Sequence, residues 1–516
     1  MPVDVDVAVV GFGPGGEVIS SLLGQNGHRV AVFEKYPQPY GLPRMSTLDG
    51  EVARILQHAG DAAQALDESV PQPNYLFYGA DGELALEVDF RFEICGHPAR
   101  LSLHQPHIEA SMHERIATCS NVEVHWGTEV TALNDRGNAV EITAQTPHGV
   151  EVVTAGYVVG MDGASSFVRR ALGIDLEVLH THTDQWILTD FDILDPAVSP
   201  PPTIINMRPS GPYFWGPNGA GRCRTDVRIM PGQDAAELMD DDHGYQWLED
   251  NIGIDRSSVT ITRRKLYRFL SQYARSFRRG RVFLGGDAAH SMTPYMAQGS
   301  CSAMRDGMNL AWKLDAVLSG RADERLLDTY EAERLPAVIP VVEGSLKTWE
   351  LLIELDPAIA AARDEVMRSG QANVPQVPPL TTGLLYRDAT GAIKSPVGEL
   401  GPQGRIRLDG REGLLDDLVG YGFQLISAEP LDDVLTDANR ERLTELGVHT
   451  IILGESPGQA VDLNNTYRRF LSAHSITALL SRPDFYIYGT AVTTEDVTDL
   501  VDSLVANLSP STAGAR

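Results

Sequence analysis

The sequence is short of cysteine and of basic residues, and each shortage excludes a class of protein. It has four cysteines in 516 residues and no CxxC pair. This argues against a disulfide scaffold or a structural zinc site and is typical of a reducing cytoplasm. Lysine and arginine number 42 against 70 aspartate and glutamate, which gives a net charge of −28. A surface this acidic repels phosphate backbones and anionic membranes, so we expect neither nucleic acid nor a membrane as a partner.

The sequence has no apolar run that approaches the roughly 20 residues needed to span a bilayer. The opening residues, MPVDVDVAVVGFG, carry acids where a secretory signal carries bases. We therefore expect a cytoplasmic protein. A chain of this length should divide into two or three domains.

A glycine-rich turn lies between an expected strand and an expected helix near the start. Residues 3–10 form a β-branched apolar run, GFGPGG follows at 11–16, and a helical stretch leads to a second apolar run, HRVAVFEK. This is the context in which a GxGxxG motif binds a dinucleotide. Gly13 would let the backbone approach a pyrophosphate, and the helix N-terminus would face the phosphates. The alternative is a plain structural turn.

Glu34 narrows the choice of dinucleotide. It ends the second apolar run, where a carboxylate can accept hydrogen bonds from both hydroxyls of an adenosine ribose. An acid at this position disfavours a ribose 2′-phosphate. The turn therefore predicts FAD or NAD rather than NADP.

Two later segments favour FAD. GMDGASSFVR at 160–169 follows a strand, and GGDAAH at 285–290 ends another, with a helix expected near 299–319. Asp287 would lie at the C-terminal end of a buried strand, where ligands bind in open α/β sheets, and it could hold the ribityl chain of a flavin. The helix beginning near Gly299 would direct its positive end at the charge of a reduced flavin. The alternative is a strand-end turn with an aspartate helix cap.

The pattern of residues changes twice along the rest of the chain. Short strands and turns alternate in its middle, as in residues 122–133 and 185–194, which is typical of antiparallel sheet. Residues 322–368 are expected to be helical. A linker rich in Pro and Gly follows, and from about 396 the pattern predicts a small α/β domain with a terminal helix.

At this point the three motifs resemble a known family. The GxGxxG with its terminal Glu34, then MDGASSFVRRALG, then GRVFLGGDAAHSMTPYMAQGSCSAMRDGMNLAWKL occur in the order of the FAD-dependent aromatic hydroxylases, the class A flavoprotein monooxygenases. The chain looks most like the 3-(3-hydroxyphenyl)propionate hydroxylase branch. The similarity runs from residue 3 to about 345, and the C-terminal stretch is similar, more loosely, to the thioredoxin-like tail of that branch.

The resemblance implies an α/β fold in which a Rossmann-like FAD-binding domain is interleaved with an antiparallel-sheet substrate domain, followed by a C-terminal thioredoxin-like domain without CxxC. The tail has no cysteine after Cys301. We therefore expect it to act in assembly or stability, and we expect a homo-oligomer. The expected parts are an FAD-binding domain at 1–175, with substrate-domain strands inserted near 75–103, a substrate-binding sheet domain at 176–280, a return to the FAD-binding domain with helices at 281–368, a linker arm at 369–395 and the thioredoxin-like domain at 396–510.

The implied reaction uses NAD(P)H and O2 to hydroxylate a small, electron-rich aromatic substrate, typically a phenol, through a flavin C4a-hydroperoxide. One alternative is a tailoring oxygenase on the same scaffold that epoxidises a polycyclic natural product or performs Baeyer–Villiger insertion on it. Another is a non-catalytic FAD-binding assembly protein. A flavin halogenase is disfavoured because its WxWxIP motif is absent.

The family's cofactor residues carry over position by position. Asp287 matches the acid near the ribityl and pyrophosphate, and Asp162 matches the aspartate of the DG motif. Arg44 matches a basic residue that contacts the flavin, and Gln105 matches a glutamine near the ribityl chain. Arg169 matches an arginine with a structural role. Arg44 and Pro294 are the expected catalytic residues, and no metal ligand is expected. The full expected cofactor set is Gly11, Gly13, Gly15, Gly16, Glu34, Lys35, Arg44, Gln105, Asp162, Asp287, Pro294, Gly299 and Ser300.

The third motif departs from the family in two places. Ala297-Gln298-Gly299-Ser300-Cys301 stands where the family has GQGMN or GQGMA, and Gly307 follows Asp306 where the family has alanine. We expect Ala297 to alter the backbone path near the flavin. Cys301 is expected to be a small buried apolar residue rather than a reactive thiol.

The substrate is expected to lie against the antiparallel strands and the loop around Pro294. Aromatic residues there could pack on a ring, and an arginine could hold a substrate carboxylate. The alternatives are ordinary sheet packing and a solvated strand face. No catalytic base is identified, and His290 is expected to be structural. The expected substrate residues are Trp186, Tyr213, Trp215, Arg224, Tyr267 and Tyr295.

Overall fold

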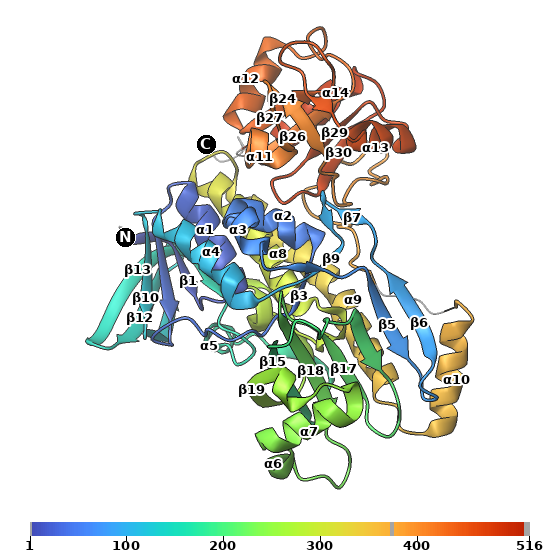
Figure 1. Cartoon of the computed structure of the whole chain (residues 1–516). Helices are drawn as coiled ribbons and strands as arrows, with labels where there is room; N and C mark the ends of the chain where they lie inside the picture. The colour runs from blue at the N-terminus through green and yellow to red at the C-terminus, as the bar shows by residue number, and fades with distance from the viewer. Residues whose placement is uncertain (1–2, 372–375, 510–516) are drawn as a thin grey trace.

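An eight-stranded sheet carries the glycine-rich turn in the computed structural model, which describes residues 3–371 and 376–509 (Figure 1). Strand β1 (Val5–Val10) lies between β2 (Val30–Glu34) and β13 (Gly149–Gly160) and runs parallel to both. Strand β22 (Val282–Leu284) pairs in parallel with the end of β13. These strands are apolar along most of their length because both faces of a parallel sheet are covered. Their carboxyl ends meet at one edge, as an open α/β sheet requires.

The expectation of antiparallel sheet over 122–133 is wrong for its first half. Strand β10 (Val122–Trp126) pairs in parallel with β2, with Trp126 opposite Glu34. The physical reason is the helix that precedes it, α4 (Gln105–Ala117), which supplies the crossover that a parallel strand needs. Strands β11 (Glu129–Asp135) and β12 (Val140–Thr146) are antiparallel and pair onward to β13.

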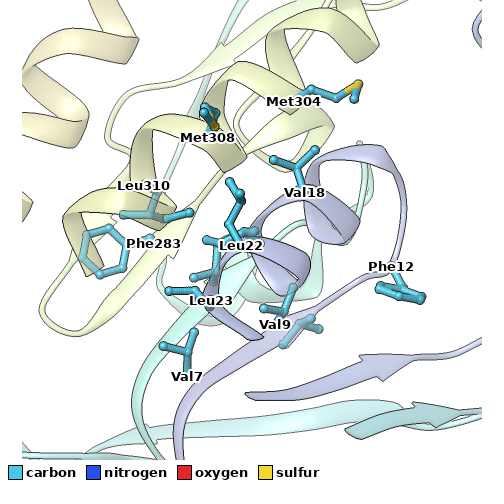
Figure 2. Close-up of a cluster of buried hydrophobic side chains, with 14 of the residues drawn as sticks. Val7, Val9, Phe12, Val18, Leu22, Leu23, Phe283, Met304, Met308 and Leu310 are labelled. Atoms are coloured by element: carbon cyan, nitrogen blue, oxygen red, sulfur yellow. The ribbon is translucent and has the colours of Figure 1, made fainter. Parts of the chain in front are cut away.

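Helices α1 (Pro14–Gln25) and α8 (Gly299–Leu318) pack against each other over the sheet. Figure 2 shows Met304 and Met308 of α8 beside Val18 and Leu22 of α1. Their backbones approach closely: a Cβ on Gly307 would lie 2.6 Å from the carbonyl oxygen of Gly15. The family's alanine at this position would not fit here, which explains the departure in the sequence.

A second, seven-stranded sheet lies below the first in Figure 1. Its order is β19-β15-β18-β17-β16-β5-β6, and every neighbouring pair is antiparallel except β16 and β5. Within the range 75–103 only β5 and β6 join this sheet, because β9 (Arg100–Ser102) pairs with β3 (Thr47–Asp49) and β4 (Val70–Pro71) instead. The strands of the sheet are β5 (Asn74–Tyr78), β6 (Leu84–Asp89), β15 (Trp186–Ile193), β16 (Thr203–Asn206), β17 (Tyr213–Pro217), β18 (Arg222–Arg228) and β19 (Val259–Tyr267).

Helices and a packed arm connect these sheets to the C-terminal part. Helices α9 (Asp328–Leu352) and α10 (Pro357–Arg368) follow α8, and α10 lies beside β6 (Figure 1). The described residues between α10 and β24 (Arg405–Leu408) form no helix or strand. Their apolar side chains, such as Leu380 and Val397, are nevertheless buried, so this arm packs on the protein.

The C-terminal part is built on a four-stranded sheet of order β27-β26-β29-β30. The parallel pair β26 and β27 lies next to the antiparallel pair β29 and β30, and α14 follows the last strand. None of the described helices is long and apolar enough to cross a membrane. The bounds are β26 (Phe423–Ser427), α12 (Asp437–Glu445), β27 (Val448–Ile452), α13 (Thr466–His474), β29 (Ala478–Ser481), β30 (Ile487–Ala491) and α14 (Asp496–Leu508).

Buried ion pairs fasten this C-terminal part to the rest. Arg482 donates hydrogen bonds to both carboxylate oxygens of Glu333 on α9, at 2.9 and 2.7 Å, and also binds Asp484. Lys313 of α8 reaches the same Glu333 carboxylate at 2.6 Å. Burial alone would raise the pKa of Glu333, but Arg482 and Lys313 lower it to about 2. A second buried pair joins Arg54 to Asp416.

We predict that Arg482→Met lowers the free energy of unfolding by about 3–5 kcal/mol, because it leaves buried carboxylates without their main cation. Urea unfolding of the full chain measures this loss. Arg407→Met is the matched control in the same part of the chain, since Arg407 and Glu412 form an exposed ion pair whose loss should cost much less. Equal losses in the two variants would show that the buried cluster does not hold the C-terminal part in place.

Candidate functional site

A cavity of about 640 Å³ opens where the two large sheets face each other. At one end it is lined by the glycine-rich turn and by the carboxyl ends of β2, β13 and β22. At the other end it is lined by side chains of the seven-stranded sheet and the segment before α8. The motifs at 11–16, 160–169 and 285–300 therefore contribute to one site.

The glycines of the first turn differ in what surrounds them. Gly11 has a φ of +99°, and a Cβ there would overlap Met161. A Cβ on Gly16 would overlap the carbonyl oxygen of Gly11. A Cβ on Gly13 would meet no atom within 4 Å, because it would project into the cavity. Gly13 thus keeps a cradle open at the N-terminus of α1, as an approaching pyrophosphate requires.

The Glu34 carboxylate is held by two backbone amides, one in the glycine-rich turn and one just after β2. Its carboxylate accepts hydrogen bonds from the amide of Phe12 at 2.9 Å and from the amide of Tyr36 at 3.0 Å. Both Glu34 and the neighbouring Lys35 line the cavity, as does Gly15. The carboxylate is oriented toward the place where the turn predicts a ribose.

The DG segment and the GGDAAH segment are tied together by Arg169. Its guanidinium donates to the carbonyl oxygens of Ala164 and Ala288, at 3.0 and 2.9 Å. Asp162 accepts a hydrogen bond from the amide of Val168 at 3.0 Å and lines the cavity. Arg169 therefore joins the two segments instead of facing the cavity.

Asp287 follows β22 and opens onto the cavity. Surrounding protein raises the pKa of its carboxyl, and His290 and Arg44 act in the opposite direction. The turn that presents Asp287 is fixed by Asp306, which accepts hydrogen bonds from the amide of Gly286 at 2.9 Å and pairs with His290 at 2.6 Å. Arg334 donates to the same Asp306 carboxylate at 2.8 Å, so His290 is occupied in a buried network.

Gln105 and Arg44 meet through the backbone. The side-chain oxygen of Gln105 accepts hydrogen bonds from the amides of Arg44 and Met45, at 2.8 and 2.6 Å, and its amide nitrogen donates to Glu109. Gln105 thereby fixes the loop that carries Arg44. The Arg44 guanidinium lies over the Tyr40 ring, 4.3 Å from its centre, and both residues line the cavity.

The segment before α8 contains Ala297, where the sequence departs from the family, and the backbone of this residue is strained. Ala297 has a φ of +54°, in the left-handed region that glycine adopts more readily. Pro294, Gly299 and Ser300 line the cavity at the positive end of α8. Cys301 is fully buried, and burial raises the pKa of its thiol to about 12, so it is not a reactive thiolate at neutral pH.

Only part of the expected substrate set reaches the cavity. Tyr267, Tyr295 and Arg224 line it. Trp186 lies behind Tyr295, with the ring centres 5.7 Å apart, and its indole donates to Asp184. Its packing supports the wall of the cavity without forming the lining surface.

Tyr213 and Trp215 also lie outside the cavity lining, and the alternation of side chains along β17 explains why. Successive side chains on a strand point to opposite faces. On β17 it is Phe214 that faces the cavity, while Tyr213 packs against Trp247 of α7 (Asp241–Ile252) on the other face. The aromatic cluster was visible in the sequence, but the face toward the cavity was not.

Several lining residues were missed by the sequence reasoning. They share the cavity-facing side of the seven-stranded sheet. The spacing of Asp226, two residues after Arg224 on β18, was the signal that could have found it. The missed residues are Tyr75, Ile205 and Asp226.

Arg224 is occupied by the protein. It pairs with Asp190 through two hydrogen bonds, at 2.7 and 3.2 Å, and donates to the carbonyl oxygens of Pro43 and Arg44, each at 2.7 Å. Its guanidinium therefore anchors the loop that carries Arg44 and is not free to hold a carboxylate.

Two segments of the chain match known protein families. The FAD binding domain family matches residues 4–345, and the HcaD C-terminal domain family matches residues 398–507. The residues at the turn fit such a cofactor, since the open space at Gly13 and the oriented Glu34 carboxylate suit a pyrophosphate and a ribose.

Two curated relatives align over nearly the whole chain. A probable NADH-specific resorcinol 4-hydroxylase of Rhodococcus jostii (strain RHA1) is 32% identical, and the alignment covers 98% of this chain and 96% of that protein. A 3-(3-hydroxy-phenyl)propionate/3-hydroxycinnamic acid hydroxylase of Mycolicibacterium gilvum (strain PYR-GCK) is 31% identical, with coverage of 93% and 88%.

Solved structures share the fold. The flavin-dependent monooxygenase PieE, in complex with FAD and substrate, superimposes with a TM-score of 0.80 at 21% identity, covering 98% of this chain and 100% of that one. Aklavinone-11 hydroxylase, in complex with FAD and aklavinone, gives 0.77 at 24% identity, covering 98% and 99%. The mixed α/β architecture expected from the sequence is thus confirmed.

We predict that Gly13→Ala and Gly16→Ala fail in different ways. Ala is compatible with the backbone at position 13, where φ is −97° and ψ is −176°, so the variant should fold with wild-type stability yet purify with little FAD. Gly16→Ala forces a contact with the Gly11 carbonyl and should lower stability by about 1–3 kcal/mol. Thermal unfolding and the flavin absorbance per polypeptide separate the two effects. Full flavin content in Gly13→Ala would rule out the cradle.

A second prediction concerns Asp287. Asp287→Ala should bind FAD about 10- to 100-fold more weakly, because it would remove the charge-assisted hydrogen bond that we expect Asp287 to make with the cofactor. Titration of the apoprotein with FAD, followed by flavin fluorescence, measures the affinity. An affinity equal to that of the wild type would show that Asp287 does not contact the cofactor.

Proposed function

The chain belongs to the FAD binding domain family, and from that membership we propose which ring and which reductant it uses. Like its curated relatives, the enzyme is an FAD-dependent aromatic hydroxylase that uses NAD(P)H and O2, so the resemblance drawn from the motifs is confirmed. We propose that the substrate is a phenolic ring of one or two hydroxyl groups and that the reductant is NADH. The names of both relatives support a hydroxylated ring, and the name of the resorcinol 4-hydroxylase supports NADH.

One observation carries the proposal. The cavity is continuous from the dinucleotide cradle at Gly13 to the aromatic side chains of the seven-stranded sheet. Tyr267 lies where the two ends meet: burial raises the pKa of its hydroxyl, and the carboxylates of Asp287 and Asp226 both add to this effect. A ring bound beside Tyr267 would therefore lie next to a cofactor anchored at Asp287.

The side chains divide the work of binding and positioning. When bound, FAD takes reducing equivalents from NADH and activates O2 for transfer of one oxygen atom to the ring. The amides at the start of α1 would hold its phosphates, Glu34 its ribose, and Asp287 its ribityl chain. The N-terminus of α8 and Arg44 would stabilise negative charge. Pro294 and the tyrosines would exclude water and orient the ring.

The alternatives raised by the sequence are not favoured. An aromatic hydroxylase from angucycline biosynthesis is among the similar solved structures, but identities below 25% support the fold alone. The curated relatives that align over the whole chain act on single phenolic rings according to their names.

We also propose that the C-terminal part is thioredoxin-like and serves stability and assembly. A parallel pair followed by an antiparallel pair, with helices between and after them, supports that fold. It contains no cysteine, so dithiol chemistry is excluded. We expect a homo-oligomer located in the cytoplasm, with domain boundaries near those expected from the motifs.

The experiment is a substrate screen with the FAD-loaded enzyme. Resorcinol and other simple phenols should stimulate NADH oxidation well above the basal rate, more than NADPH oxidation, and the product should gain the mass of one oxygen atom. Bound FAD with no phenol-stimulated NADH oxidation would point to the non-catalytic flavoprotein instead. Turnover of polycyclic ketones but not of phenols would point to the tailoring oxygenase.

A further inference from the structure

Asp226 is an unpaired carboxylate in the wall of the cavity. It lies on β18, on the same face as Arg224, and lines the part of the cavity formed by the seven-stranded sheet. Within the described residues its carboxylate makes no hydrogen bond or ion pair. Buried carboxylates elsewhere in the fold, such as Asp190 and Asp306, are each held by at least one arginine. Asp226 is half-buried, and no cation among the described residues contacts its carboxylate directly, so its oxygens are available to a ligand in the cavity.

The two cations whose charge acts on Asp226, Arg224 and Arg263, are engaged elsewhere. Arg224 binds Asp190 and two backbone carbonyls. Arg263 donates to the carbonyl of Pro43 and also pairs with Asp190. The lining holds four further cations. Arg268 is exposed to solvent, and Arg44 stacks on Tyr40. Lys35 directly follows Glu34, and Arg170 directly follows the DG segment. Among the described residues that line it, this end of the cavity therefore offers an acceptor for a hydrogen bond, while its buried cation, Arg224, is already paired with Asp190.

The surroundings of Asp226 suit a neutral ring. Phe214 and Ile205 contribute apolar surface, and Tyr75, Tyr267 and Tyr295 contribute aromatic surface. Burial raises the pKa of Asp226 to about 6, with Arg224 acting in the opposite direction. At neutral pH most of the carboxylate is charged, and a hydrogen bond from a hydroxyl group would satisfy it. A second carboxylate beside it would be repelled.

We propose that Asp226 is the specificity-determining residue of this site: its carboxylate accepts a hydrogen bond from a ring hydroxyl and restricts the substrate to neutral hydroxylated rings. This inference rests on the proposed function and narrows it. It places the enzyme with substrates like resorcinol, and it excludes rings that carry a carboxylate arm, such as 3-(3-hydroxyphenyl)propionate. The two kinds of substrate are those named in the two curated relatives.

The test compares the binding of these two compounds to the oxidised, FAD-loaded enzyme. Each is titrated while the flavin absorbance is recorded, and calorimetry gives an independent dissociation constant. The wild type should bind resorcinol about 100-fold or more tightly than the propionate, since like charges placed together oppose binding by several kcal/mol. Asp226→Asn should bind resorcinol about 10- to 100-fold more weakly, and its affinity for the propionate should stay equal or rise.

Two further variants control for side effects. Asp192→Asn removes the same charge from the same sheet, but Asp192 is half exposed and lies outside the cavity lining, so the wild-type preference should persist. Asp226→Glu keeps the charge and should keep the preference with a lower affinity. The ratio of the two dissociation constants in the wild type still tests the proposal if Asp226→Asn does not fold or loses its FAD.

The outcomes separate this inference from the proposed function. Tighter binding and faster hydroxylation of the propionate by the wild type would overturn the role of Asp226 and leave an aromatic hydroxylase. An unchanged preference in folded Asp226→Asn would also overturn it. If neither compound binds and no phenol is hydroxylated, the proposed function fails and this inference falls with it.

Discussion

The site depends on the close approach of two helices. A Cβ on Gly15 of α1 would lie 2.7 Å from the carbonyl oxygen of Ala303 on α8, and a Cβ on Gly307 of α8 would lie 2.6 Å from the carbonyl oxygen of Gly15. Only glycine at both positions allows the backbones to meet in this way. Because they meet there, the N-termini of both helices open into one cavity. The positive ends of two helix dipoles would thus face the same bound dinucleotide.

Buried ion networks keep the walls of this cavity in place. Arg305 of α8 binds Asp49 and Glu51 and donates to the side chain of Gln298, directly before the helix. Tyr486 of the C-terminal part donates to Glu51 at 3.0 Å, so that part is linked through Glu51 and Arg305 to Gln298 in the cavity segment before α8. Such networks cost desolvation energy, and removing one member leaves a buried charge. This network holds α8 and the segment that contains Asp49 and Glu51 together beside the cavity.

The sequence predicted the local motifs well, because each depends on residues close together in the chain. The strand, turn and helix around Gly13 follow from glycine sterics and apolar patterning, and both are local. The parallel pairing of β10 with β2 could not be predicted from the strand itself, because a half-buried strand has the same pattern in parallel and antiparallel pairs. The direction of the pairing is decided by the crossover helix α4. Tyr213 and Trp215 were misjudged because one residue of register determines which face of a strand meets the cavity. The spacing of Asp226 could have placed it on the same strand face as Arg224, but only the structure shows that the carboxylate of Asp226 has no cation in direct contact among the residues that it describes.

The central claim is that one cavity holds FAD at the glycine-rich end and a neutral phenolic ring beside Asp226. A crystal structure of the enzyme with FAD and resorcinol tests it most directly. The account predicts phosphates within hydrogen-bond distance of the amides at the start of α1, and a ring hydroxyl within hydrogen-bond distance of the Asp226 carboxylate. A flavin bound away from α1, or a ring held by an arginine with Asp226 facing empty solvent, would contradict it.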